Sequence, residues 1–139
     1  MNKVVIDTSA WIDFFRNQTG SVGDAVARAI EQDLAVLTGP VLSELLQGVK
    51  NRRESQTLAE LFGVLPFVEV IRNDWEEAGE LLRRLRQRGI TVPLTDAVIA
   101  AVAKRYRCGV LTLDRHFEHL EVPLFHSSGH EGECQADRG

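Results

Sequence analysis

Four acidic residues of this 139-residue chain are spaced so that their carboxylates could act together. They are Asp7, Glu44, Asp96 and Asp114. Carboxylates held close together raise one another's pKa values, and a bound divalent cation relieves that repulsion. A set of oxygen ligands without His or Cys suits Mg²⁺ or Mn²⁺ rather than Zn²⁺. Such a cation can activate a bound water and neutralise charge on a phosphodiester, so the four residues predict metal-dependent phosphodiester hydrolysis.

The elements that must position these carboxylates are short strands that alternate with helices. Apolar, β-branched runs predict strands at 3–6, 34–38, 67–71, 110–113 and 123–126. Apolar residues at helical spacing predict helices at 8–16, 22–30, 41–50, 57–65, 73–89 and 96–107. Asn73 and Thr95 are the predicted N-caps of the last two helices. This alternation predicts an α/β domain with a mainly parallel sheet covered by helices on both faces.

The topology of such a sheet brings the four acidic residues to one edge. The C-terminal ends of parallel strands and the N-termini of the following helices lie on the same edge. Asp7 follows the first strand and Asp114 follows the fourth. Glu44 lies near the start of the helix after the second strand, and Asp96 opens the helix before the fourth. If the fourth strand pairs with the first, Asp7 and Asp114 lie at the switch point where ligands bind.

Each acidic residue also has an ordinary structural explanation. Asp96 could cap a helix, Glu44 could be a solvated helical residue, and Asp114 before Arg115 could belong to a turn. For any one of these residues, a structural role is commoner than a catalytic one. The convergence of all four on one edge of the sheet favours a shared role. Spacing alone leaves the choice between a structural and a catalytic role open.

The four acidic residues lie in four sequence blocks, which are VVIDTSAWIDFF, GPVLSELLQGV, PLTDAVIAAVAKRYR and VLTLDRHF. These blocks resemble the motif blocks of the PIN-domain ribonucleases, and most of all those of the VapC toxins of toxin–antitoxin pairs. They occur in the family's order, and each contains one of the four acidic residues. We therefore expect a PIN domain over 1–126. Residues 127–139 hold three Gly and almost nothing apolar, and we interpret them as a flexible tail.

The resemblance implies a fold, an activity and a set of partners. The fold is a parallel five-stranded sheet with helices on both faces. The activity is Mg²⁺- or Mn²⁺-dependent endonucleolytic cleavage of RNA, frequently tRNA or ribosomal RNA. Asp7, Glu44, Asp96 and Asp114 would be both the metal ligands and the catalytic residues. A cognate VapB-type antitoxin would wrap the toxin near the acidic site, and the toxins commonly form homodimers.

The resemblance also implies supporting residues around the carboxylates. Thr8, Ser9 and Thr112 match hydroxyl positions of the motifs and would orient a carboxylate or a metal-bound water. Three arginines are the first candidates for contacts with the substrate. They are Arg16 after the Asp7 block, Arg88 before the Asp96 block, and Arg115 beside Asp114.

The histidines of the C-terminal quarter raise the alternative of a zinc site. They are His116, His119, His126 and His130, with Cys134 nearby. The HxxH spacing follows a strand end rather than lying on a long helix, so scattered surface histidines are the better interpretation. The apolar residues Trp11, Phe14 and Phe15 are interpreted as a helix face that packs on the core or on a partner.

Composition limits the alternatives. Hydrophobic residues make up 44% and charged residues 26%, and no apolar run approaches the roughly 20 residues needed to span a membrane. Two cysteines without a CxxC motif predict a reducing cytoplasm. The net charge of −4 argues at first against a nucleic-acid partner. Without the four acidic residues and the tail, however, residues 1–126 carry 15 basic and 13 acidic side chains, a net charge of +2.

Two other functions remain as alternatives. A phosphatase of the haloacid-dehalogenase type would use Asp7 as its nucleophile, but it needs a second Asp two residues later, where this chain has Ser9. A PIN-like module that only binds a partner would need no metal, and the complete acidic set argues against it.

Overall fold

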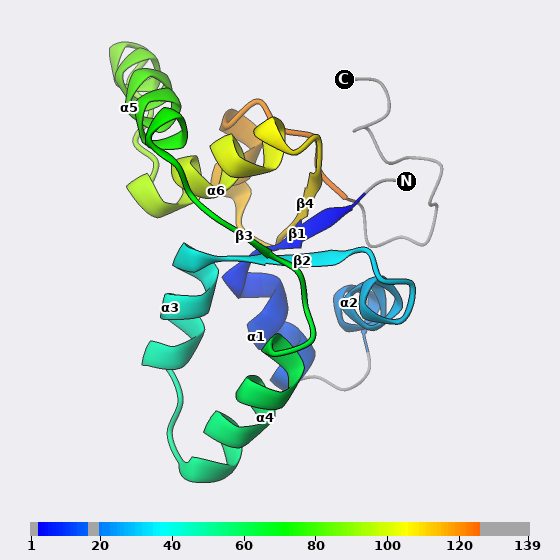
Figure 1. The fold of residues 1–139 in the computed structure, drawn as a ribbon. Coiled ribbons are helices and arrows are strands. Elements are labelled where there is room, and N and C mark those ends of the chain that lie inside the picture. The colour runs from blue at the N-terminus through cyan, green and yellow to red at the C-terminus, as the bar shows by residue number, and fades with distance from the viewer. Residues whose placement is uncertain (1–2, 17–19, 126–139) are drawn as a thin grey trace.

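A parallel β-sheet lies between two groups of helices in a computed structural model, which describes residues 3–16 and 20–125 (Figure 1). The predicted tail over 127–139 therefore lies outside the described residues, as do His126 and His130. Among the described helices, none combines the length and the apolar character that crossing a membrane requires.

The sheet has the strand order β3-β2-β1-β4. The strands are β1 (Val4–Ile6), β2 (Ala35–Thr38), β3 (Phe67–Val68) and β4 (Gly109–Leu111). All pairs are parallel, and Val5 of β1 is aligned with Val36 on one side and with Val110 on the other. Every residue of the three longer strands is buried, because helices cover both faces of the sheet. All of these residues are apolar except Thr38, whose hydroxyl is buried as well. The predicted pairing of the first and fourth strands is confirmed.

Six α-helices and one 3₁₀ helix connect and cover the strands. They are α1 (Thr8–Arg16), α2 (Ser21–Glu31), α3 (Gly39–Gln47), α4 (Arg52–Phe62), α5 (Arg72–Gln87), α6 (Leu94–Arg105) and η1 (Arg115–His119). Helices α1 to α4 lie on one side of the sheet, and α5 and α6 lie on the other (Figure 1). Right-handed crossovers produce this division, because the chain moves outward from β1 to β3 and then returns to β4.

Helix α6 is the central helix of the second layer. Every residue from 96 to 103 is buried, so the helix is enclosed on all sides by the sheet, α5 and η1. A helix buried in this way fixes the position of its first turn firmly. That first turn carries Asp96, one of the predicted site residues.

The predicted fifth strand over 123–126 is wrong. Leu124 forms only an isolated parallel bridge to Val110, with the Val110 amide donating to the Pro123 carbonyl and the Phe125 amide donating to the Val110 carbonyl. The described sheet therefore has four strands, and the chain beyond β4 supplies one bridge at its edge. The third strand is also shorter than predicted, with two residues in place of five.

Helices α4, α5 and α6 begin earlier than predicted, with different residues at their N-termini. Helix α4 begins at Arg52 rather than at Thr57, because the Asn51 side chain accepts a hydrogen bond from the Glu54 amide and caps the helix. Helix α6 begins at Leu94 after Pro93, so Thr95 is helical and not the N-cap. Helix α5 likewise has its N-cap at Ile71, not at Asn73, as the next residues are already helical.

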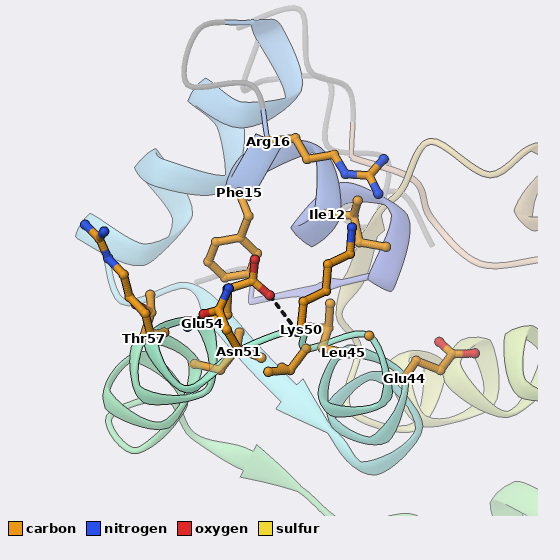
Figure 2. A pocket seen from close by; sticks show the side chains of 13 residues that line it. Ile12, Phe15, Arg16, Glu44, Leu45, Lys50, Asn51, Glu54 and Thr57 are labelled. Carbon is orange, nitrogen blue, oxygen red and sulfur yellow. Dashed lines mark hydrogen bonds between the residues drawn. The ribbon is translucent and has the colours of Figure 1, made fainter.

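The early start of α4 creates a groove between α1, α3 and α4, shown in Figure 2. Its volume is about 610 Å³. Ile12 and Phe15 of α1 and Leu45 of α3 give it apolar walls, while Glu54 of α4 lies at its rim. Glu44 of α3 is among the residues that line the groove, so the groove includes one of the predicted site residues (Figure 2).

Candidate metal centre

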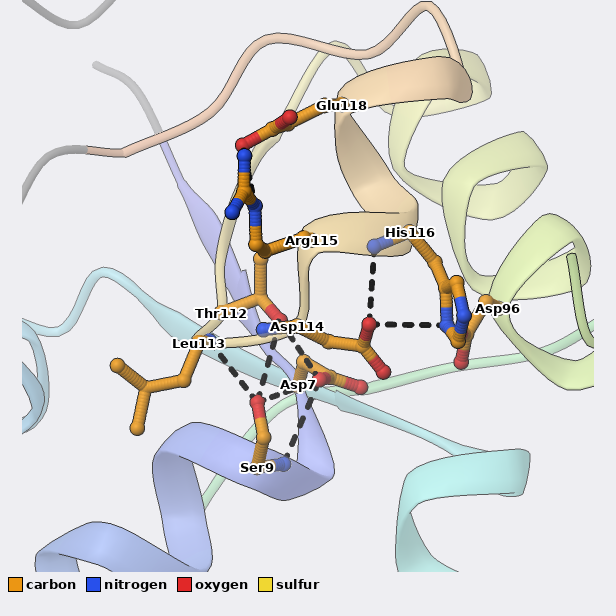
Figure 3. Close-up of polar contacts among 9 residues, drawn as sticks. All are labelled: Asp7, Ser9, Asp96, Thr112, Leu113, Asp114, Arg115, His116 and Glu118. Atoms are coloured by element: carbon orange, nitrogen blue, oxygen red, sulfur yellow. Dashed lines mark hydrogen bonds and ion pairs between the residues drawn. The ribbon is translucent and has the colours of Figure 1, made fainter.

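Asp7 is held at the end of β1 by hydroxyl groups from two different elements (Figure 3). Its Oδ2 accepts hydrogen bonds from Ser9 Oγ and from Thr112 Oγ1, both at 2.8 Å. The two hydroxyl oxygens lie 3.1 Å apart, and Ser9 Oγ in turn accepts from the Leu113 amide at 2.9 Å. Asp7 is only 4% exposed. These contacts fix the carboxylate through one of its oxygens and connect the ends of β1 and β4.

Asp114 and Asp96 approach each other around the side chain of His116 (Figure 3). The His116 Nδ1 lies 2.9 Å from Asp114 Oδ1 and 3.2 Å from Asp96 Oδ2. Asp114 also accepts a hydrogen bond from the His116 amide at 2.9 Å, and so caps η1, while its own amide donates to Thr112 Oγ1. One ligand atom from each of the three residues lies within 4.8 Å of the other two.

The pKa of Asp96 is raised because the side chain is buried and because the carboxylates of Asp7 and Asp114 lie close to it. Burial raises it, the nearby charges of Asp7 and Asp114 raise it further, and the contact with His116 lowers it only in part, so that it reaches about 6. Among the described residues, the ion pairs of Asp96 and Asp114 involve His116 and no Arg or Lys. The cluster is thus a set of mutually repelling carboxylates with a deficit of positive charge.

Glu44 is not among the three residues whose ligand atoms lie within 4.8 Å of one another, and it is connected instead to the residue that follows Asp7. The hydroxyl of Thr8, the residue after Asp7, donates a short hydrogen bond to Glu44 Oε1 and so connects the start of α1 with α3. Glu44 itself is half-buried. Each of the three hydroxyl residues expected to orient a carboxylate therefore does contact one: Thr8 contacts Glu44, while Ser9 and Thr112 contact Asp7.

Within the described part of the chain, the three arginines expected to contact substrate form no ion pair with the carboxylates of the cluster. Arg16 lines the groove and is exposed, and Arg88 is the exposed residue that follows α5. Arg115 is 88% exposed and lies 3.6 Å from Glu118 in an ion pair on η1. None of these contacts orders an arginine against a carboxylate of the cluster.

The donor set fits a divalent cation. Several carboxylates converge on one edge of the sheet, and the raised pKa of Asp96 shows that they lack a compensating charge. Asp7, Asp96, Asp114 and Glu44 offer the hard oxygen atoms that Mg²⁺ and Mn²⁺ prefer. His116 adds a nitrogen donor to this set, which the sequence analysis assigned to the protein surface.

Comparison with known proteins decides which family has this arrangement. The family model of the PIN domain matches residues 4–123. This chain belongs to the PIN-domain family. It is 32% identical over 120 residues to the ribonuclease VapC11 of Mycobacterium tuberculosis and to the VapC ribonuclease Mb1587 of Mycobacterium bovis. The match covers 83% of this chain and 89% of each relative.

Solved structures show the same PIN fold. The DNA-bound VapBC complex from Salmonella typhimurium matches with a TM-score of 0.75 and 19% identity, over 91% of this chain and 98% of that one. FitAcB from Neisseria gonorrhoeae matches with a TM-score of 0.71 and 19% identity, over 91% and 99% of the two chains. At these identities the likeness shows the fold. The expected resemblance to VapC-type PIN domains and the expected α/β class are both confirmed.

Proposed function

We propose that this protein is a Mg²⁺- or Mn²⁺-dependent endoribonuclease and the toxin component of a VapBC-type pair, acting in the cytoplasm. The observation that carries the proposal is the convergence of Asp7, Asp96 and Asp114 at the switch point between β1 and β4, where their ion pairs among the described residues involve His116 and no Arg or Lys. The similarity to proteins named VapC ribonucleases supports RNA as the substrate class.

Each residue of the cluster has a role in this reaction. Asp7, Glu44, Asp96 and Asp114 would hold the cation, which when bound supplies an acidified water and positive charge for the scissile phosphate. Ser9 and Thr112 hold Asp7 by one oxygen, and Thr8 holds Glu44. This fixed orientation reduces the rearrangement needed at the moment of reaction, which is the main contribution a protein makes in such a site.

The three candidate arginines are proposed to contact the phosphates of RNA on either side of the cut. Arg16, Arg88 and Arg115 are exposed and come from three different elements. With the acidic cluster neutralised by a cation, the net charge of residues 1–126 no longer repels a polyanion. Replacing any one arginine by Ala should weaken RNA binding and make it less dependent on salt. tRNA and ribosomal RNA are the proposed substrates.

A cognate antitoxin is the proposed partner, and the groove between α1, α3 and α4 is its proposed site. The solved structures that this chain resembles include VapBC and FitAB complexes. Ile12 and Phe15 offer apolar walls to a partner segment, and Glu44 in the lining of the groove would attract a basic side chain. Co-expression with the small protein of a neighbouring reading frame should yield a stable, inactive complex. Ile12→Glu should weaken that complex, whereas Val64→Glu, outside this groove, should not.

A homodimer is also proposed, with α5 as the candidate face. Ile71 at the start of α5 and Trp75 four residues later are 44% and 51% exposed, an arrangement that leaves apolar surface open to solvent. Trp75→Glu should reduce the molar mass in solution from that of a dimer to that of a monomer. An unchanged dimer would place the interface elsewhere. Residues 127–139 remain predicted to form a tail separate from the PIN domain.

The proposed activity is tested by incubating 5′-labelled RNA with protein freed of metal and then supplied with Mg²⁺ or Mn²⁺. Cleavage should appear with either cation and stop with EDTA. Attack by a metal-bound water should leave no 2′,3′-cyclic phosphate, because the RNA 2′-hydroxyl is not the nucleophile. Asp7→Asn should abolish cleavage with the fold unchanged by circular dichroism. Persistent cleavage by Asp7→Asn would overturn the mechanism, and absence of Mn²⁺ binding at the four carboxylates would favour a non-catalytic PIN module.

A further inference from the structure

We propose that His116 is itself a ligand of the cation and that its imidazole shifts the preference of the site from Mg²⁺ toward Mn²⁺. This inference rests on the proposed metal-dependent function, and it assigns a role to a residue outside the four acidic positions. His116 comes from η1, the short helix that follows β4, and its imidazole lies within reach of both Asp114 and Asp96 (Figure 3).

The distances around His116 match those between ligands of one ion. In an octahedral site with bonds of roughly 2.1 Å, neighbouring ligand atoms lie about 3.0 Å apart. The Nδ1 of His116 lies 2.9 Å from Asp114 Oδ1 and 3.2 Å from Asp96 Oδ2. All three ligand atoms lie within 4.8 Å of one another, a span that one cation can bridge. The nitrogen thus already occupies a ligand position relative to both carboxylates.

Hydrogen bonding alone does not account for this arrangement. A neutral or protonated imidazole carries at most one hydrogen on Nδ1, and two carboxylate oxygens approach that nitrogen. Only one of the two can receive a well-directed hydrogen bond, whereas a cation would bind all three atoms at once. Two carboxylate oxygens that converge on one imidazole nitrogen therefore form the arrangement that a shared cation would complete.

The backbone holds His116 in place without help from its ring. The amide of His116 donates to Asp114 Oδ1 at 2.9 Å, and the next residue, Phe117, is buried in the core with 1% exposure. The ring therefore projects into the cluster because η1 is anchored on both sides of it. These anchors remain when the imidazole is replaced, so variants at this position should keep their fold.

A nitrogen ligand changes which cation the site prefers. Mg²⁺ is a hard cation that takes oxygen ligands almost exclusively, whereas first-row transition metals accept imidazole readily. A site with three or four carboxylates and one imidazole should therefore bind Mn²⁺ more tightly than Mg²⁺. An amide oxygen in place of the imidazole nitrogen should remove most of this preference.

The direct test is electron spin-echo envelope modulation of the full chain loaded with Mn²⁺. A coordinated imidazole produces modulation from ¹⁴N, which we expect in the unaltered protein and not in His116→Asn or His116→Ala. Titrations with Mn²⁺ and with Mg²⁺ should show Mn²⁺ affinity reduced by about 10-fold or more in His116→Ala. His116→Asn should lower the ratio of Mn²⁺ to Mg²⁺ affinity, because its amide oxygen keeps a hard ligand near the same position. His119→Gln, exposed on the same 3₁₀ helix, is the matched control and should change neither quantity.

The outcomes separate this inference from the proposed function. Mn²⁺ bound at the carboxylates without ¹⁴N modulation would overturn the role of His116 and leave the metal-dependent nuclease intact. Modulation that persists in His116→Ala would assign the nitrogen to another residue and also overturn the inference. Failure to bind Mn²⁺ at all, with Asp7→Asn behaving like the unaltered protein, would overturn the metal site and with it both proposals.

Discussion

A buried aspartate lies at each end of helix α6, and the two have opposite electrostatic environments. Asp96 belongs to the first turn of α6, whereas Asp74 belongs to α5 and contacts Arg105, the last residue of α6. Near the C-terminal end, Arg105 donates from Nε and Nη2 to the two carboxylate oxygens of Asp74 at 2.9 and 2.7 Å. Asp74 also accepts from the Ile71 amide, and the Arg105 guanidinium lies over the Tyr106 ring. At the N-terminal end, Asp96 faces the like charges of Asp7 and Asp114, and its contact with His116 offsets them only in part.

Burial raises the pKa of both aspartates, and the neighbouring groups decide whether the final pKa lies above or below the ordinary value. Burial raises the pKa of Asp74, but the hydrogen bonds from Arg105 and Ile71 and the charge of Arg105 outweigh it, so the pKa is lowered. The pKa of Asp96 is raised by burial and by its like-charged neighbours to about 6. The first aspartate is satisfied within the fold, because it joins α5 to α6. The second needs positive charge from outside the chain, and this need is the mark of a functional site.

The largest expected effect is on RNA cleavage, where the two aspartates should differ most. Asp96→Asn should reduce cleavage by more than about 100-fold, because a lost metal ligand costs at least as much as a lost supporting contact. Asp74→Asn, measured below its unfolding temperature, should cleave at nearly the unaltered rate. Equal losses in both variants would mean that Asp96 acts only through the fold.

The free energy of unfolding should depend on Asp74, although RNA cleavage should not. Asp74→Asn should lower the free energy of unfolding by about 2–4 kcal/mol, since it leaves the Arg105 charge without its partner at a largely buried position. Denaturant unfolding at pH 7 measures this. The exposed pair of Arg72 and Glu76 on the same helix gives the control, because Glu76→Gln should cost less than about 0.5 kcal/mol. A loss below that value at Asp74 would show that the pair is not structural.

Metal should stabilise the protein only through the N-terminal end of α6. At a Mn²⁺ concentration 100 times its dissociation constant, the folded state should gain about 2.7 kcal/mol. Asp96→Asn should lose most of this gain, whereas Asp74→Asn should keep it on top of a lower starting stability. Thermal unfolding with and without Mn²⁺ checks the prediction, and an equal gain in all three proteins would place the cation elsewhere.

The smallest expected effect is the pH dependence of the metal-free protein. The pKa of Asp96 rises from 3.8 to about 6 on folding, so ionisation of this group opposes folding. Its penalty is absent below about pH 4, grows as the pH rises to about 6, and is constant above. Asp96→Asn should therefore stabilise the metal-free protein by about 1–2 kcal/mol at pH 7, and by nothing at pH 4. Asp74 has the opposite sign, because its stabilising contribution is present above its ordinary pKa and is lost as the pH falls. Unfolding between pH 4 and 7 measures both.

Strand ends were the most predictable part of the site. Asp7 follows β1 and Asp114 closely follows β4, and the topology of a parallel sheet brings these ends together whatever the details of packing. The first turn of α6 obeys the same rule, which places Asp96 at this edge. The helix start itself was predicted two residues late, because Pro93 outweighs the capping tendency of Thr95.

Side-chain partners between distant segments were not predictable in the same way. His116 follows Asp114 by two residues, and this proximity could have suggested a place at the site, but its contact with Asp96 depends on how η1 packs on α6. The Asp74–Arg105 pair joins residues 31 positions apart, and no local pattern marks it. The groove depends on the position of α4, whose start at the Asn51 cap was missed because 52–56 carries no apolar stripe.

The most direct test of the metal centre follows cation binding and RNA cleavage in the same titration. Protein freed of metal is titrated with Mn²⁺, and bound Mn²⁺ and initial cleavage rate are measured at each step for the unaltered chain, Asp96→Asn and Asp74→Asn. Cleavage should be absent without metal and should rise in proportion to bound Mn²⁺ in the unaltered chain and in Asp74→Asn, with both signals weakened in Asp96→Asn. Cleavage by the metal-free protein, or unchanged Mn²⁺ binding and cleavage in Asp96→Asn, would contradict a catalytic cation at this cluster.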